Sequence, residues 1–88
     1  MKVKKDFVAR KVGDSDIVVA TGKAVKHFNG YITLNETGRF LWDLLGRDVA
    51  ETELVDKMLE EYDVERETAE RDVKNFLNVL AENGILEK

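Results

Sequence analysis

The chain has 88 residues, of which 43% are hydrophobic and 36% are charged, with no proline and no cysteine. This balance is typical of one folded domain, and a chain this short buries only about 60–65% of its unfolded surface, which leaves no room for a deep enclosed active site. The missing cysteines exclude a disulfide framework and a thiolate nucleophile, and a single histidine cannot form a zinc site. No segment approaches the roughly 18 apolar residues of a membrane span, and the first residues lack the apolar core of a signal peptide. We therefore expect one cytoplasmic domain over residues 1–88.

Charge is divided unevenly along the chain. Residues 1–34 carry seven Lys and Arg against three Asp, a balance of +4, whereas residues 35–88 carry seven against fifteen Asp and Glu, a balance of −8. Such asymmetry bears on the choice of partners and not on the fold.

The first third of the chain predicts an antiparallel hairpin. Phe7–Val12 is rich in strand-forming residues, the polar segment 13–16 predicts a turn, and 17–20 is nearly continuous and β-branched. The segment 21–23 predicts a second turn.

The next segment predicts a third strand. A clean alternation puts Ile32 and Leu34, with Phe28, on one face and Tyr31 and Thr33 on the other. Asn29-Gly30 lies just before this alternation and predicts a turn or a bulge.

After residue 35 the apolar spacing changes to that of helices. Asn35 is a good N-cap for a first helix that Gly46 ends, and Asp48 with Glu51 resembles a capping box for a second helix. A third helix extends from Glu65 to Asn83-Gly84, after which Ile85-Leu86 returns to the core. The apolar stripes of the three helices are Phe40, Leu41, Leu44 and Leu45, then Leu54, Val55, Met58, Leu59 and Tyr62, then Ala69, Val73, Phe76, Leu77 and Leu80. The predicted fold class is α+β, a winged helix-turn-helix-like domain in the order β-β-β-α-α-α.

No set of residues in the sequence suggests catalysis. There is no Gly-rich phosphate loop, no pair of histidines and no Ser-His-Asp set, so we expect no catalytic residue, no metal site and no cofactor. His27 fits a partly exposed strand residue, and Trp42 fits core or rim packing better than ligand stacking. Glu60, Glu61 and Asp63 are poorly placed to share a cation because adjacent helix positions point apart.

A winged-helix shape raises the possibility of DNA binding, which the charge of the third helix opposes. From Glu65 to Asn83 this helix has three basic and five acidic residues, a balance of −2. Affinity for a duplex comes largely from neutralising phosphates, so an acidic recognition helix would repel DNA. The remaining class is protein or peptide binding, because the edge of a small sheet accepts an extended peptide as a further strand unless lysines such as Lys23 and Lys26 shield it.

Several segments together resemble the PqqD family over about residues 7–87. They are Leu34-Asn35-Glu36-Thr37-Gly38 followed by Leu41-Trp42-Asp43-Leu44-Leu45, then Tyr62-Asp63-Val64, the pattern Asp72, Val73, Phe76, Leu77 and Leu80, Gly-Ile-Leu at 84–86, and Phe28-Asn29-Gly30. Glu65 departs from the family, which usually places Ser or Asp there as a helix cap.

This resemblance implies a non-catalytic RiPP recognition element with a winged helix-turn-helix fold. Such proteins bind the leader segment of a ribosomally made precursor peptide and present it to a modifying enzyme, typically a radical SAM enzyme. The family is named for the pathway to pyrroloquinoline quinone, a product that the resemblance does not imply for this chain. The leader lies as an added strand beside the third strand, against the third helix.

Carried over to this sequence, the resemblance places the strand side of the site at residues 31–34. With Phe76 and Leu80 facing the core, one flank of the third helix offers polar residues and Val79 to the peptide, whereas the opposite flank, with Arg66, Glu70 and Leu77, is the alternative. The alternative is that Val79 only pads the joint with a strand or with Ile85. The expected peptide-binding residues are Tyr31, Ile32, Thr33, Leu34, Asp72, Asn75, Val79 and Asn83.

The expected partners are a precursor peptide and a radical SAM or other peptide-modifying enzyme, with neither nucleic acid nor membrane. The chain acts as a monomer or a homodimer, since the edge that takes a peptide can also pair with its twin. The alternatives are a winged-helix DNA-binding regulator and a structural subunit that packs on an enzyme without touching the substrate.

Overall fold

The computed structural model describes residues 1–28 and 30–87, and its centre is a three-stranded antiparallel sheet. The strands β2 (Phe7–Val12), β3 (Ser15–Ala20) and β4 (Ile32–Leu34) lie in the order β2-β3-β4. The registers pair Phe7 with Ala20 and Thr33 with Ile17. The predicted sheet and strand order are therefore confirmed.

The hairpin turn is tighter than the sequence predicted. Val12 pairs directly with Ser15, so the turn consists of Gly13-Asp14 alone, and Ser15 and Asp16 belong to β3. Gly13 has a φ of +62°, which the first position of a two-residue hairpin turn often requires and which glycine adopts at little cost.

The connection from β3 to β4 also differs from the prediction. A short 3₁₀ helix, η1 (Gly22–Lys26), replaces the expected turn at 21–23, and His27 ends it as an exposed residue outside any strand. Phe28 likewise precedes β4, and its ring packs edge-on against Phe7 with centroids 5.4 Å apart. The predicted turn or bulge at Asn29-Gly30 includes Asn29, which lies outside the described residues.

Three helices follow the sheet, α1 (Glu36–Leu44), α2 (Glu51–Glu61) and α3 (Arg66–Glu82). The predicted cap of α1 is confirmed, because the Asn35 side chain accepts a hydrogen bond from the Gly38 amide at 2.8 Å.

The predicted capping box of α2 is wrong, since Ala50 is the N-cap and no side chain caps this helix. The Asp48 carboxylate instead pairs with the N-terminal ammonium of Met1.

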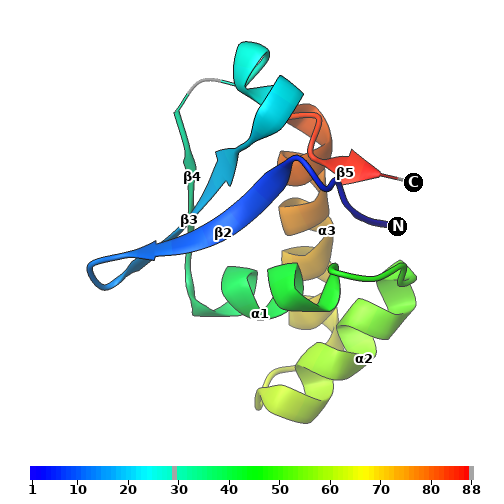
Figure 1. Cartoon of the computed structure of the whole chain (residues 1–88). Coiled ribbons are helices and arrows are strands. Elements are labelled where there is room, and N and C mark those ends of the chain that lie inside the picture. The colour runs from blue at the N-terminus through cyan, green and yellow to red at the C-terminus, as the bar shows by residue number, and fades with distance from the viewer. Residues whose placement is uncertain (29, 88) are drawn as a thin grey trace.

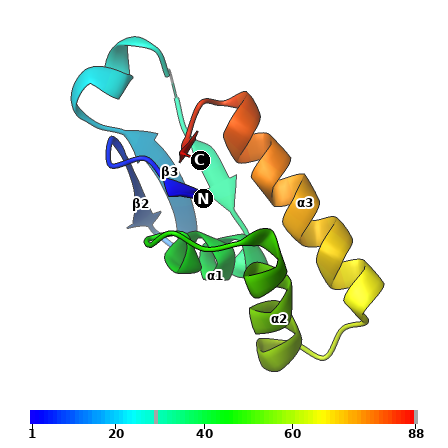
Figure 2. The same cartoon turned by 90° about the vertical axis from the view of Figure 1, so that its right-hand side faces the viewer.

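The core lies where the three helices meet one face of the sheet. Val18, Leu45, Leu54, Leu80 and Ile85 are fully buried, and Trp42 is 7% exposed, which confirms its role in packing. In Figure 1 α3 passes behind α1 and stands to the right of the strands, and Figure 2 shows β4 facing the upper half of α3.

The two ends of the chain form a ladder that the sequence did not predict. β1 (Lys2–Val3) pairs antiparallel with β5 (Leu86–Glu87), so Val3 lies opposite Leu86. This ladder follows Ile85, whose burial confirms the predicted return to the core.

Candidate functional site: a groove between an edge strand and the last helix

The strand side of the candidate site is the outer edge of β4. Among the described residues β4 pairs only with β3, so half of its N–H and C=O groups face away from the sheet without a strand partner. Thr33 is exposed, whereas Leu34 is buried and Ile32 is half-buried, because alternate side chains point to opposite faces. This edge is a template for one more strand.

The helix side of the site is the flank of α3 that faces this edge. Phe76 and Val79 line a hollow of about 320 Å³ with the three β4 residues, and a second hollow of about 300 Å³ extends it toward Asp72 and Asn75. We call the two hollows together the β4–α3 groove. Its residues are Ile32, Thr33, Leu34, Asn35, Thr37, Gly38, Leu41, Asp72, Asn75, Phe76 and Val79.

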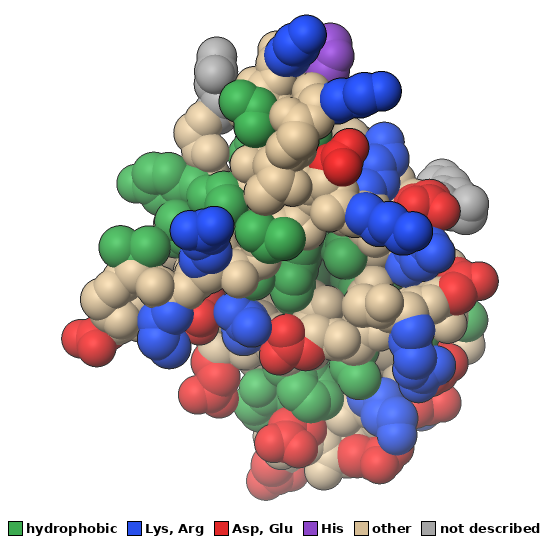
Figure 3. Space-filling view, viewed as in Figure 1, with side chains coloured by type: hydrophobic (Ala, Val, Ile, Leu, Met, Phe, Trp, Pro, Cys, Tyr) green, Lys and Arg blue, Asp and Glu red, His purple; other side chains and the backbone are tan. Residues whose placement is uncertain are grey.

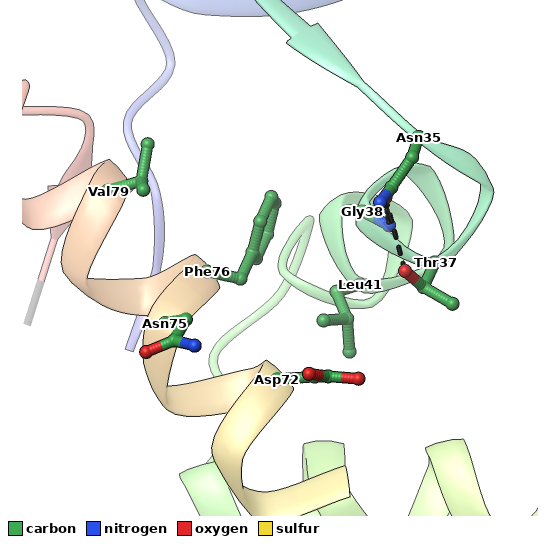
Figure 4. Close-up of a pocket in the computed structure, with 8 residues that line it drawn as sticks. All are labelled: Asn35, Thr37, Gly38, Leu41, Asp72, Asn75, Phe76 and Val79. Atoms are coloured by element: carbon green, nitrogen blue, oxygen red, sulfur yellow. Dashed lines mark hydrogen bonds between the residues drawn. The ribbon is translucent and has the colours of Figure 1, made fainter. Parts of the chain in front are cut away.

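The start of α1 closes one end of the groove, as Figure 4 shows. Asn35 caps the helix there, and its Oδ1 also accepts a hydrogen bond from the Thr37 hydroxyl at 3.1 Å. Gly38 lies directly under the Phe76 ring, and a Cβ at position 38 would be 3.0 Å from Asn35 Oδ1 and 3.4 Å from Phe76 Cε1. The absence of a side chain at Gly38 therefore gives the Phe76 ring its place in the groove.

Six of the eight expected site residues lie together in this groove. They are Ile32, Thr33, Leu34, Asp72, Asn75 and Val79. Tyr31 does not line it and is 64% exposed just before β4, and Asn83 lines a different cavity, near η1.

Sequence reasoning missed the part of the groove that α1 supplies. Asn35 was predicted only as a helix cap, Thr37 and Gly38 entered only through the family resemblance, and nothing in their spacing indicates that they face α3. It also assigned Phe76 wholly to the core, whereas Phe76 is only half-buried and lines both hollows. The buried stripe of α3 is instead Ala69, Val73, Leu77 and Leu80.

The first two turns of the opposite flank of α3 face α2. Arg66 and Glu70 line a separate hollow of about 310 Å³ with Glu51 and Val55 of α2, and Arg66 donates to Asp56 of α2 at 3.0 Å. Leu77 is buried and lines another hollow with Met1, Glu51 and Leu86. Among the residues that the structure describes, the hollows on this flank are lined by none of the β4 residues.

The described residues 1–28 and 30–87 contain no group of three or more His, Cys, Asp or Glu side chains placed to hold a metal ion. In the same part of the chain no helix is both long and apolar enough to cross a membrane. The features that the β4–α3 groove offers to a ligand are its shape, a free strand edge and polar side chains.

The fold and groove define a class of protein, a winged-helix-like α+β domain with an open edge strand beside its last helix. The model of the family described as coenzyme PQQ synthesis protein D (PqqD) matches residues 17–86. The chain belongs to this family. A search of the curated proteins finds no match.

Two solved structures are similar over nearly the whole chain. "TbiB1 in Complex with the TbiA(beta) Leader Peptide" is 31% identical, with a TM-score of 0.78, and the match covers 99% of this chain and 95% of that one. "Lasso peptide synthetase B1 complexed with the leader peptide" is 22% identical, with a TM-score of 0.76, and the match covers 99% of this chain and 96% of that one. At 22% identity the second structure bears on the fold alone.

Proposed function

We propose that this protein is a RiPP recognition element, which binds the leader segment of a ribosomally made precursor peptide and presents it to a modifying enzyme. The observation that carries the proposal is the open edge of β4 beside the β4–α3 groove. A 31% identical structure whose printed title names a leader peptide as its ligand supports it. The protein itself does no chemistry, and it binds without a cofactor.

The leader binds by strand addition. Its backbone pairs with the free groups of β4, and alternate side chains enter the groove against Phe76 and Val79. We retain Tyr31 and Asn83 in the proposed site because both lie next to the η1 end of the groove, Tyr31 just before β4 and Asn83 one helical turn beyond Val79.

The partner enzyme in this proposal is a radical SAM enzyme or another peptide-modifying enzyme, and the domain over 1–88 works in the cytoplasm as a monomer or a homodimer. Co-purification of the tagged chain with the enzymes encoded beside its gene tests the partner, and a sedimentation measurement gives the oligomeric state.

The experiment for leader binding compares two substitutions on the same helix. Val79 lines the groove and is 41% exposed, whereas Ala81 is exposed outside the groove. Val79→Asp should weaken binding of the leader from the neighbouring precursor gene at least tenfold, which corresponds to about 1.4 kcal/mol, with an unchanged melting temperature. Ala81→Asp adds the same charge and should leave the affinity within twofold. Equal affinity for wild type and Val79→Asp would place the peptide elsewhere, and the Arg66 and Glu70 flank would then be the next site to test.

A further inference from the structure

A cavity of about 350 Å³ lies beyond the groove, between η1 and the C-terminal end of α3. Its rim carries Lys4, Lys23 and His27 against one carboxylate, Asp6. The Phe7 and Phe28 side chains give it an apolar lining. Figure 3 shows Lys side chains beside the single His at this end of the molecule.

The two lysines of this rim carry unneutralised charge. Within residues 1–28 and 30–87 the salt bridges that involve lysine use Lys2, Lys11 and Lys57, and none uses Lys4 or Lys23. Their ammonium groups are thus available for an anionic partner.

The other end of the groove has the opposite character. The hollow near α1 is lined by the Asp72 carboxylate and the amides of Asn35 and Asn75, and no Lys or Arg lines it. In Figure 4 the Asp72 and Asn75 side chains extend from α3 at this end, below the Phe76 ring.

One flank of α3 connects the two ends. Asp72, Val79 and Asn83 fall within about 40° of one another around the helix, and Asn83 lines the η1 cavity. From Asp72 to Asn83 the helix rises about 17 Å, at 1.5 Å per residue. An extended peptide covers that distance with about five residues, so three alternate side chains face the helix.

We propose that the groove selects leaders by the order of basic, apolar and acidic side chains along them, an inference that rests on the proposed function. A basic or amide side chain of the leader meets Asp72, an apolar side chain meets Phe76 and Val79, and an acidic side chain meets Lys4 and Lys23. β4 runs from the η1 end toward α1, and an antiparallel strand pairs more stably than a parallel one. From its N-terminal to its C-terminal side, the leader therefore carries a basic side chain, then an apolar one, then an acidic one.

A random nonapeptide library displayed on phage and selected on the immobilised protein tests this order. We expect enriched peptides to carry Lys, Arg or an amide, then an apolar residue, then Asp or Glu, at alternate positions. Enrichment without a charge bias, or with the reverse order, would overturn the inference.

Charge reversals at each end make the test specific. Selection on the Lys4→Glu, Lys23→Glu double variant should replace the acidic preference by a basic one at the C-terminal position alone. Asp72→Lys should reverse the preference at the N-terminal position alone. The matched controls are Lys74→Glu and Glu70→Lys, which make the same changes on the α2-facing flank and should leave the selected sequences unchanged.

Failure of this inference is distinguishable from failure of the proposed function. If enriched peptides lose affinity for Val79→Asp while the charge reversals have no effect, leader binding stands and the charge order is wrong. If no peptide is enriched and the precursor leader does not bind either, both are wrong.

Discussion

The two flanks of α3 are similar in their mixture of polar and apolar residues and differ in the elements that surround them. Asp72, Asn75 and Val79 on one flank and Arg66, Glu70 and Leu77 on the other each mix polar residues with one apolar residue. On the second flank α2 packs against the helix and pairs Asp56 with Arg66, and Leu77 is buried. On the first flank the neighbour is an edge strand with free backbone groups, so the side chains line an open groove. Whether a flank of α3 can form a peptide-binding site therefore depends on the element that lies opposite it.

The largest effect that separates core from groove is expected at two adjacent residues of α3. Leu80 is fully buried and Val79 is 41% exposed. Leu80→Ala should lower the free energy of unfolding by about 2–5 kcal/mol, because it removes buried methyl groups and leaves a cavity. Val79→Ala should lower it by less than about 1 kcal/mol. Urea unfolding of both variants measures this, and equal losses would contradict the assignment of Val79 to an open surface.

Phe76 and Leu77 sharpen the same comparison, because Phe76 lines the groove and Leu77 is buried outside it. Phe76→Ala should cost about 1–3 kcal/mol of stability, less than for a fully buried Phe, and should weaken leader binding at least tenfold. Leu77→Ala should also lose stability, but the folded protein should bind the leader within twofold of wild type. Calorimetric titration well below each melting temperature measures this, and a Phe76→Ala variant with wild-type affinity would contradict the groove.

Most of the fold could be predicted from the sequence, because apolar periodicity depends on local geometry. The three strands, the three helices and the Asn35 cap all follow from spacing and from residues close in sequence. The capping box at Asp48 failed because that carboxylate pairs with Met1, 47 residues away, and local spacing carries no information on such a contact. The β1–β5 ladder was missed because its two strands lie at opposite ends of the chain. Each strand also has only two residues, which are too few to show an alternation.

The candidate site was predictable only in part. Periodicity places Asp72, Asn75 and Val79 on one flank of α3, and the family resemblance supplies the strand beside it. The α1 contribution depends on the angle between α1 and α3, which brings Gly38 under Phe76. Phe76 was misassigned because an apolar residue next to the buried stripe has the same spacing whether it is covered or lines a groove.

A smaller effect is expected from salt, because the end of the groove next to η1 is basic. Raising the salt concentration should slow association of an acidic leader several-fold, since charges farther apart than about 8 Å are screened at 0.15 M. Stopped-flow association at low and high salt measures the rate. An unchanged rate would reject electrostatic steering and leave strand addition intact.

The smallest effect is expected at Asp48, which lies on neither flank. The N-terminal ammonium of Met1 hydrogen-bonds to this carboxylate and lowers its pKa. Because the folded state favours the charged form, the stability it adds is present above the ordinary carboxyl pKa of about 3.9 and is lost as the pH falls through the lowered value. Thermal melts of wild type and Asp48→Asn should therefore converge as the pH falls through that lowered pKa, with leader affinity at neutral pH unchanged. A difference in melting temperature that grows in acid would contradict this.

The pairing of β1 with β5 has a consequence for how this domain can be joined to other proteins. Lys2 lies opposite Glu87, and this ladder lies on the side of the molecule away from β4 (Figure 1). A second domain attached at either end therefore leaves the β4 edge uncovered. Tethered to a modifying enzyme in this way, the domain would hold a bound precursor at the high effective concentration that a short linker sets, without any new contact between the two proteins.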